Sequence, residues 1–238
     1  MSNPTVLTTR NLTAGYGGHP AINDISVELR SDEVLCLIGH NGAGKSTLLK
    51  CLFGLLTPEA GTVTIDGKET TAESARKITD LGVAMVPEGR GVFPSLTVRE
   101  IFSLGMHAVG IPRKEQGERV DWVLDILPAI KEFMNRPAGT LSGGQQQMVS
   151  IGRALLSRPR ILLMDEPSIG LAPKLFQDLL APIRALQQRD GLSILLVEQN
   201  VREALKISDR AVVMKSGMMI WEGLPAELED NERLMELY

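Results

Sequence analysis

The sequence is poor in the residues and patterns that metal sites and membrane spans require. Only two cysteines and three histidines occur among 238 residues, and none of them stands at a metal-ligand spacing. Cys36 and Cys51 each lie among apolar neighbours, which predicts that they pack in the core. No apolar run approaches the roughly 18 residues that could span a bilayer. These shortages argue against a zinc site and against a transmembrane helix.

An excess of charge of one sign is also missing. The formal net charge is −4 and the pI is about 5.5, which argues against a general nucleic-acid-binding protein. The N-terminal stretch MSNPTVLTTR lacks the charged-then-apolar pattern of a signal peptide, so we expect the chain to stay in the cytoplasm. With 43% hydrophobic residues, the chain has material for a full core, in one large α/β domain or two very small ones.

The hydrophobic pattern predicts strands that alternate with helices. Short or continuously apolar runs predict strands at Val6–Thr9, Ile25–Leu29, Val34–Ile38, Gly61–Gly67, Gly82–Val86, Ile161–Met164, Ser193–Val197, Ala211–Met214 and Met218–Trp221. Helical patterns are found at Ser46–Leu56, after the capping box Thr97–Glu100, at Arg119–Leu127 and at Ser142–Ser157. The alternation predicts an α/β domain with a mainly parallel sheet and a helical block inserted at about residues 89–159.

A phosphate-binding loop follows the predicted strand Val34–Ile38. The sequence GHNGAGKST matches the pattern G-x-x-x-x-G-K-[ST] in full. Its glycines let backbone N–H groups surround a phosphate, and the new helix directs its positive end at the same group. The lysine can reach the β and γ phosphates, and the following serine can hold Mg²⁺. The predicted ATP-binding residues are Gly39, His40, Asn41, Gly42, Ala43, Gly44, Lys45, Ser46 and Thr47.

Two carboxylates end the buried strand Ile161–Met164. At the carboxyl end of a parallel strand, such side chains emerge into the ligand crevice. We expect Asp165 to position Mg²⁺ and Glu166 to polarise or deprotonate the attacking water. A helix-capping or loop role is the structural alternative for an acid pair considered alone.

Two successive glycines open the predicted helix Ser142–Ser157. Ser142 and Gln145 have the capping-box spacing, which gives this segment a purely structural interpretation. That interpretation leaves Gly143 and Gly144 unexplained, because a helical glycine costs roughly 1 kcal/mol relative to alanine. Close approach of an anion to the helix N-terminus is the alternative hypothesis.

Together the phosphate loop, LSGGQ at 141–145 and LLMDE at 162–166 resemble the ATP-binding-cassette (ABC) ATPases over essentially the whole chain. The resemblance implies a RecA-like P-loop NTPase core, an antiparallel β subdomain and an inserted helical subdomain within one domain, 1–238. It also implies a head-to-tail dimer in which Ser142, Gly143, Gly144 and Gln145 of one chain contact the ATP of the other. Tyr16 falls where the family stacks an aromatic ring on adenine; a core or turn tyrosine is the alternative.

Three positions depart from the wider family pattern. Glu88 stands where a glutamine is usual, and the resemblance assigns it a metal or coupling role. Gln199 replaces a switch histidine, and its amide can still donate a hydrogen bond to phosphate. Ala172 replaces an aspartate in the loop after the acid pair. These departures concern γ-phosphate sensing and signalling between subunits.

Several segments resemble one subfamily more narrowly. VPEGR, LSGGQQQM with IGRALLSRP, DEPSIGLAP and VEQN are similar to the shorter ATPase subunit of branched-chain amino-acid importers, whose relatives serve urea and short-chain amides. The resemblance implies ATP hydrolysis at the cytoplasmic face of the inner membrane. It implies as partners two membrane-spanning permease subunits, a second related ATPase (or a second copy) and, indirectly, an extracytoplasmic solute-binding protein. Glu88–Phe93 and the inserted helices would contact the membrane subunit.

Other classes of protein fit the sequence less well. A P-loop kinase or GTPase would leave LSGGQ unexplained and lacks a base-recognition motif. ABC proteins that act on DNA or ribosomes typically carry two cassettes or a long coiled-coil insertion, and neither is present. An exporter subunit is disfavoured mainly by the subfamily motifs.

Overall fold

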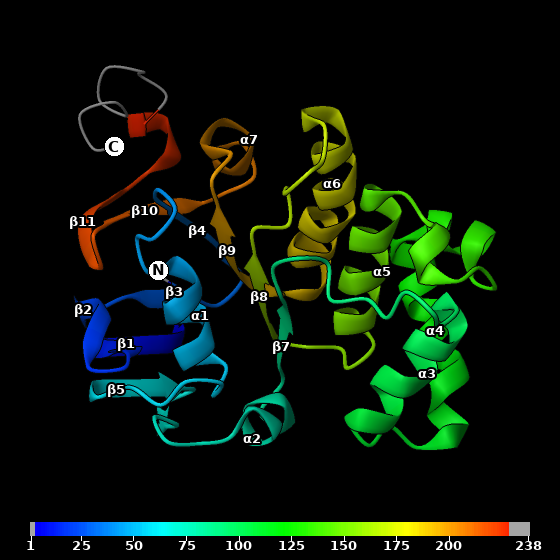
Figure 1. Cartoon of the computed structure of the whole chain (residues 1–238), viewed down its shortest axis with the longest axis horizontal. Coiled ribbons are helices and arrows are strands. Elements are labelled where there is room, and N and C mark those ends of the chain that lie inside the picture. The colour runs from blue at the N-terminus through cyan, green and yellow to red at the C-terminus, as the bar shows by residue number, and fades with distance from the viewer. Residues whose placement is uncertain (1–2, 229–238) are drawn as a thin grey trace.

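The computed structural model describes residues 3–228, which form two sheets and a set of helices on one side (Figure 1). Six strands make the larger sheet, in the order β11-β10-β4-β9-β8-β7. All neighbours in it are parallel except β10 and β11, which form an antiparallel hairpin. The strands are β4 (Val34–Ile38), β7 (Val83–Val86), β8 (Ile161–Asp165), β9 (Ser193–Glu198), β10 (Arg210–Lys215) and β11 (Met218–Gly223).

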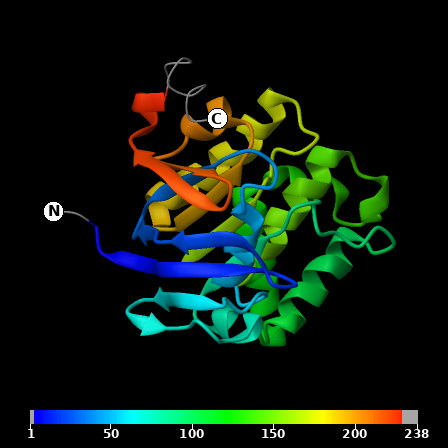
Figure 2. The same cartoon turned by 60° about the vertical axis from the view of Figure 1, so that its left-hand side comes forward.

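The smaller sheet is antiparallel and comes mostly from the N-terminal third of the chain (Figure 2). Its order is β2-β1-β5-β6, and β3 pairs with β1 on the edge opposite β5. The strands are β1 (Thr5–Tyr16), β2 (His19–Ile25), β3 (Glu28–Arg30), β5 (Ala60–Ile65) and β6 (Lys68–Glu69). This sheet supplies the antiparallel β part that the resemblance implies.

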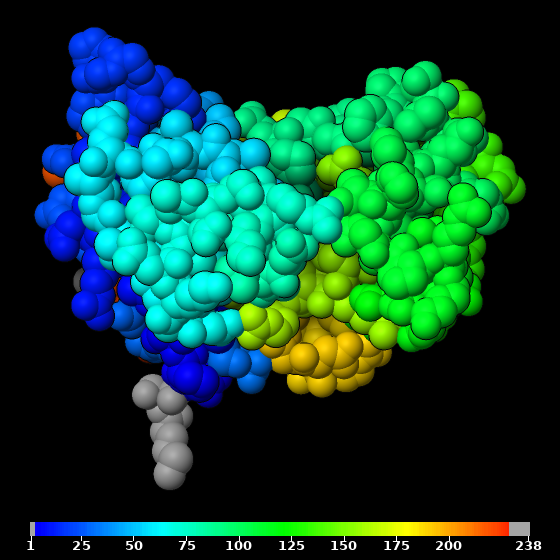
Figure 3. Space-filling view, turned by 90° about the horizontal axis from the view of Figure 1, so that it is seen from below, coloured from blue at the N-terminus to red at the C-terminus, as the bar shows by residue number. Residues whose placement is uncertain are grey.

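Most helices stand on the far side of the large sheet from this antiparallel part, and a hollow separates the two lobes on the face shown in Figure 3. The helices between β7 and β8 are α3 (Val98–Ala108), α4 (Arg113–Ile126) and α5 (Gly143–Leu155), with the 3-10 turns η1 (Pro128–Phe133) and η2 (Ala138–Thr140). The others are α1 (Lys45–Leu52), α2 (Ala75–Asp80), α6 (Pro173–Asp190), α7 (Val201–Leu205) and the turn η3 (Pro225–Leu228). The helices α3–α5 fall inside the insertion predicted at about residues 89–159. The strands before and after them, β7 and β8, pair directly in the sheet. The domain boundaries themselves stay a prediction.

Two cores, one on each face of the large sheet, explain the continuously apolar strands. Alternate residues of β4 face opposite sides: Cys36 belongs to the core that also contains residues of α3, α5 and α6, whereas Leu37 belongs to the core that contains residues of α1 and the antiparallel strands. Because both faces are covered, no polar alternation is needed, and every residue of β4 is buried. Both cysteines are buried and free, as the apolar neighbourhoods predict. Within residues 3–228 no helix has the length and apolarity that crossing a membrane requires.

Several predicted boundaries are wrong. The first helix ends at Leu52 and not at Leu56, because Gly54 adopts a left-handed φ of 72° and its N–H bonds back to Cys51 O. The strand predicted at Ile25–Leu29 is interrupted, since β2 ends at Ile25 and β3 begins at Glu28. The helix predicted from Arg119 begins earlier, at Arg113, directly after Pro112.

Candidate nucleotide-binding site

The phosphate loop connects the buried strand β4 to helix α1, as predicted. Gly42 and Gly44 have φ values of 81° and 96°, a region that other residues rarely adopt. Gly44 is also closely approached, because a Cβ atom there would lie 2.5 Å from Ile22 Cγ2. The loop therefore needs glycine for both its turn and its contact with β2. Helix α1 begins at Lys45, so its positive end faces the loop.

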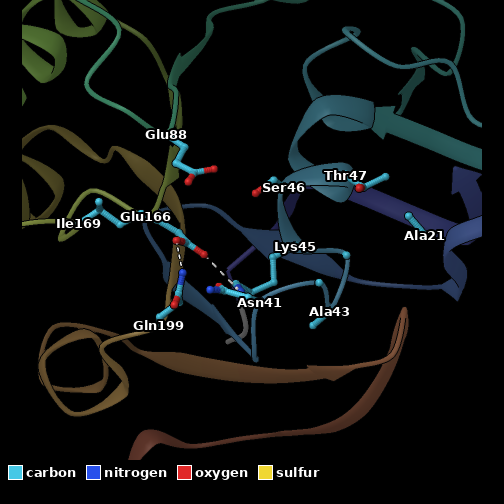
Figure 4. Close-up of a pocket in the computed structure, with 12 residues that line it drawn as sticks. Ala21, Asn41, Ala43, Lys45, Ser46, Thr47, Glu88, Glu166, Ile169 and Gln199 are labelled. Atoms are coloured by element: carbon cyan, nitrogen blue, oxygen red, sulfur yellow. Dashed lines mark hydrogen bonds and ion pairs between the residues drawn. The ribbon is translucent and has the colours of Figure 1, made fainter. Parts of the chain in front are cut away.

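The loop borders a cavity of about 400 Å³ (Figure 4). Sequence reasoning predicted most of its lining: Asn41, Gly42, Ala43, Gly44, Lys45, Ser46, Thr47, Glu88, Glu166 and Gln199. It missed Ala21 and Ile169. Ala21 comes from β2, which the pattern did not predict, and Ile169 lies in the loop between β8 and α6, within the motif DEPSIGLAP. The cavity joins segments from five separate parts of the sequence.

Lys45 occupies the centre of this arrangement and is only 4% exposed. Its Nζ donates to the carbonyl oxygens of Gly39, at 2.7 Å, and His40, at 3.1 Å. The same ammonium lies 3.3 Å from Glu166 Oε1, forming an ion pair. Gly39 and His40 thus position the lysine through their carbonyl oxygens and do not line the cavity. A buried ammonium with a single carboxylate partner is well suited to receive further negative charge.

Glu166 and Gln199 point at one another across the end of the large sheet (Figure 4). Gln199 Nε2 donates a hydrogen bond to Glu166 Oε2. Glu166 is buried and has a φ of 48°, in the left-handed region, while its backbone N–H donates to Val197 O at 2.9 Å. The carboxylate therefore lies between the amide of Gln199 and the ammonium of Lys45, facing the cavity.

Asp165 and Ser46 form the part of the site that fits Mg²⁺. Ser46 Oγ donates to Asp165 Oδ1 at 3.0 Å. Burial raises the pKa of Asp165 to about 6, with the nearby charges of Glu166 and Glu88 adding to the rise. Mg²⁺ prefers oxygen ligands and commonly binds through one or two protein groups plus phosphates. No group of three His, Cys, Asp or Glu side chains placed to hold a metal occurs in the part of the chain that the structure describes.

Replacing Asp165 with asparagine is expected to stabilise the nucleotide-free, metal-free protein at neutral pH by on the order of 1–2 kcal/mol. The folded protein holds the Asp165 proton up to about pH 6, whereas the unfolded chain releases it near its ordinary pKa of 3.8. Because the folded state binds more protons between these values, its free energy of unfolding falls as the pH rises through them. Urea unfolding of both proteins at about pH 5 and pH 7.5 measures this slope. Equal pH dependence in the two proteins would contradict the assignment.

The remaining predicted residues lie outside the cavity lining. Tyr16 is 52% exposed at the end of β1, with Lys50 Nζ 5.7 Å from its ring centre, so an adenine contact stays a prediction. Ser142 caps α5 and forms the predicted capping box with Gln145. A role for both, and for the two glycines after Ser142, in binding a partner's ATP likewise stays a prediction.

The end of one flexible side chain, that of Arg90, approaches the first of the two glycines. A Cβ atom on Gly143 would lie 2.7 Å from Arg90 Nη2, and Arg90 Nη1 donates to Gln146 Oε1 at 3.0 Å. Gly144 has no comparable neighbour, since the nearest atom to its Cβ position is Leu171 Cδ2 at 3.6 Å. No local pattern predicts the contact of Arg90 with Gly143, because these residues lie far apart in the chain.

A glycine-rich phosphate loop, a buried lysine and an acid pair at the carboxyl end of parallel strands define a P-loop nucleotide-binding protein. The profile of the ABC transporter family matches residues 22–169. The chain therefore belongs to the ABC transporter family, as one of its ATP-binding domains.

Two relatives are similar in sequence along nearly their full length. The high-affinity branched-chain amino acid transport ATP-binding protein BraG of Pseudomonas aeruginosa is 41% identical over 233 residues, covering 98% of this chain and 99% of BraG. The probable branched-chain amino acid transport ATP-binding protein LivF of Archaeoglobus fulgidus is 39% identical over 232 residues, covering 98% of both.

Solved structures confirm the ABC ATPase fold. An ABC transporter cassette in its ADP conformation has a TM-score of 0.86 at 28% identity, covering 98% of both chains. A dimeric ATP-binding cassette bound to ADP and Pi has a TM-score of 0.81 at 25% identity, covering 92% of this chain and 98% of the other.

Proposed function

We propose that this chain hydrolyses ATP and that the hydrolysis drives import of branched-chain amino acids through a membrane transporter. The observation that carries the ATPase part is the convergence of Lys45, Glu166 and Gln199 on one cavity beside the Ser46–Asp165 pair. The phosphate loop and α1 would bind the phosphates. The Lys45 ammonium, now paired with Glu166, would contact the γ-phosphate. Ser46 and Asp165 would hold Mg²⁺, whose charge would neutralise the phosphate oxygens. Glu88 faces the same region and is a further candidate for the metal or for coupling.

Glu166 is the group that would act on water. Its carboxylate is buried, faces the cavity and is ion-paired to Lys45, so release of Lys45 to the phosphate would leave it free to accept a proton. The Gln199 amide, now bonded to Glu166, would donate to the γ-phosphate or orient the water. Water would attack the γ-phosphorus while Glu166 accepts its proton. The bond between the γ-phosphorus and the β–γ bridging oxygen would break, which releases ADP and inorganic phosphate.

A pair of cassettes would complete the site. The exposed apolar side chains Ile169 and Leu175 lie in and after the loop that follows the acid pair, 42% and 54% exposed. Ser142 and Gly144 stand at the start of α5, outside the lining of the cavity of their own chain. The dimeric cassette bound to ADP and Pi supports a paired arrangement, either with a second copy or with a related ATPase.

A second hollow supports attachment to a permease. An apolar groove of about 410 Å³ runs between the core and α3, lined among others by Phe53, Met85, Phe93 and Leu104. Phe93 and Leu104 are 46% and 45% exposed, which is unusual for large apolar side chains on a protein without a partner there. An apolar helix end of a membrane subunit would fit it, placing this chain at the cytoplasmic face of the membrane. The names of BraG and LivF support branched-chain amino acids as the solute.

Affinity purification from mild-detergent membrane extracts tests the transport part. A tag on this chain is expected to bring down two membrane-spanning polypeptides and a second ATPase. A matched Leu104→Asp variant, which places a charge in the groove, is expected to lose the membrane subunits while keeping ATP binding. Recovery of the chain alone, or with ribosomes or DNA-associated proteins, would overturn the transport proposal and leave the ATPase proposal standing.

A further inference from the structure

A completely buried carboxylate lies directly behind the site, outside the cavity lining. Glu198 ends β9, is 0% exposed, and precedes Gln199 in the chain. Glu198 Oε1 accepts from the backbone N–H of Ser168 at 2.8 Å. Its Oε2 accepts from Ser168 Oγ at 2.6 Å, from Gln199 N–H at 3.1 Å and from Asn200 N–H at 3.4 Å. Every contact has Glu198 as the acceptor, which matches the ionised form.

This carboxylate is costly to keep in the interior. Burial raises its pKa, and the hydrogen bonds from Ser168, Asn200 and Gln199 act in the opposite direction. No lysine or arginine within residues 3–228 forms an ion pair with it. Glu33, a buried glutamate that precedes β4, is by contrast ion-paired with Arg210 at 2.7 Å. A neutral or apolar residue would fill the same space without the desolvation cost, so the carboxylate needs a reason beyond packing.

The four hydrogen bonds join two loops that each carry a site residue. Ser168 follows Glu166 by two positions in the loop between β8 and α6, and the backbone of this loop also carries Ile169 into the cavity. Gln199 stands in the loop between β9 and α7 and donates to Glu166. Strands β8 and β9 are neighbours, so the two loops leave the sheet side by side (Figure 1). Glu198 is the one acidic group of this edge, among the described residues, that bonds to both.

We propose that Glu198 is a positioning residue for ATP hydrolysis, which fixes the backbone of Gln199 against the Ser168 loop so that the Gln199 amide meets Glu166 and the γ-phosphate. The inference rests on the proposed ATPase function. Glu198 is fully buried outside the cavity lining, so it would contact neither ATP nor the attacking water. Its carboxylate accepts hydrogen bonds from Ser168 and from the backbone N–H of Gln199. Small displacements of a group near reacting atoms have large effects on rate, whereas ATP is bound mainly by the phosphate loop.

A Glu198→Gln substitution tests this role with little change in volume. Whichever way the new amide turns, its NH₂ group faces at least one N–H or O–H donor, so at least one bond is lost. We expect kcat for ATP hydrolysis by the full chain to fall about tenfold, with KM for ATP within about twofold of the wild type. Ser168→Ala removes the Ser168 Oγ donor alone and leaves the other three bonds. We expect Ser168→Ala to fold normally and to lower kcat about threefold. This variant therefore tests the role of Glu198 even if Glu198→Gln does not fold.

A double-mutant cycle separates positioning from general stability. If Glu198 acts through the Gln199 side chain, Glu198→Gln should cause no further loss of kcat in a Gln199→Ala background. Glu33→Gln is the matched control: it also alters a buried carboxylate, and it should lower the unfolding temperature without changing kcat. Wild-type kcat in Glu198→Gln, or a full multiplicative loss in the Gln199→Ala background, would overturn the inference alone. A wild-type chain that neither binds nor hydrolyses ATP would overturn the proposed function first, and this inference with it.

Discussion

Replacing Glu166 with glutamine is expected to reduce steady-state ATP hydrolysis by about 10² to 10⁴-fold, the range typical of removing a general base. The substitution keeps the shape of the side chain and leaves an oxygen that can accept from Gln199 or Lys45. It removes the carboxylate that we propose takes a proton from water. ATP affinity should stay within about threefold, because the phosphate loop is untouched.

The same variant should accumulate as a paired species. In the presence of ATP and Mg²⁺, unhydrolysed nucleotide would keep two cassettes together, and light scattering after size exclusion should show a mass near twice that of the monomer. The matched control is Glu132→Gln, which removes an exposed carboxylate far from the cavity and should leave turnover unchanged. Normal turnover by Glu166→Gln would refute the catalytic assignment, while lost turnover together with lost ATP binding would point to a damaged phosphate loop.

The parts of this site that sequence could predict are the ones built from contiguous residues. The phosphate loop needs its strand, its glycines and its helix in immediate succession, and β4 and α1 flank it in that order. The acid pair ends β8 for a similar reason, since a strand that is buried on both faces must be apolar up to the position where it leaves the sheet. The capping boxes at Thr97 and Ser142 also depend on a four-residue spacing, and both are present.

Contacts between distant segments could not be predicted in this way. The approach of Arg90 to Gly143 and the bonds between Glu198 and Ser168 join residues that no local pattern relates. The left-handed Gly54 ended α1 before Pro58, because a close backbone approach by Glu73 O fixes glycine at that point. The predicted strands and helices thus place the phosphate loop and the acid pair. The contacts that support these residues depend on how the loop between β8 and α6 meets the loop between β9 and α7.

Replacing Lys45 with alanine is expected to weaken ATP binding by at least about 100-fold, which corresponds to about 2.7 kcal/mol. A buried ammonium that meets phosphate oxygens makes charge-assisted hydrogen bonds, which are the strong ones in proteins. Alanine supplies neither the charge nor the donors. Binding can be measured by the fluorescence change of a labelled ATP analogue or by calorimetry. Lys77→Ala, an exposed lysine on α2, is the control and should bind ATP as the wild type does.

Loss of Lys45 also changes the nucleotide-free protein, and this second effect makes the test specific. Its ammonium now donates to the carbonyls of Gly39 and His40 and neutralises Glu166, so alanine would leave these two carbonyls and a buried carboxylate without that donor. We therefore expect the free energy of unfolding to fall by on the order of 1–3 kcal/mol, because unsatisfied buried polar groups are destabilising. Adding Glu166→Gln to Lys45→Ala should recover part of this stability by removing the unpaired charge, yet it should not restore ATP binding. Unchanged ATP affinity in Lys45→Ala would contradict the role of the phosphate loop, and recovery of binding in the double variant would show that the lost affinity came from the stranded carboxylate.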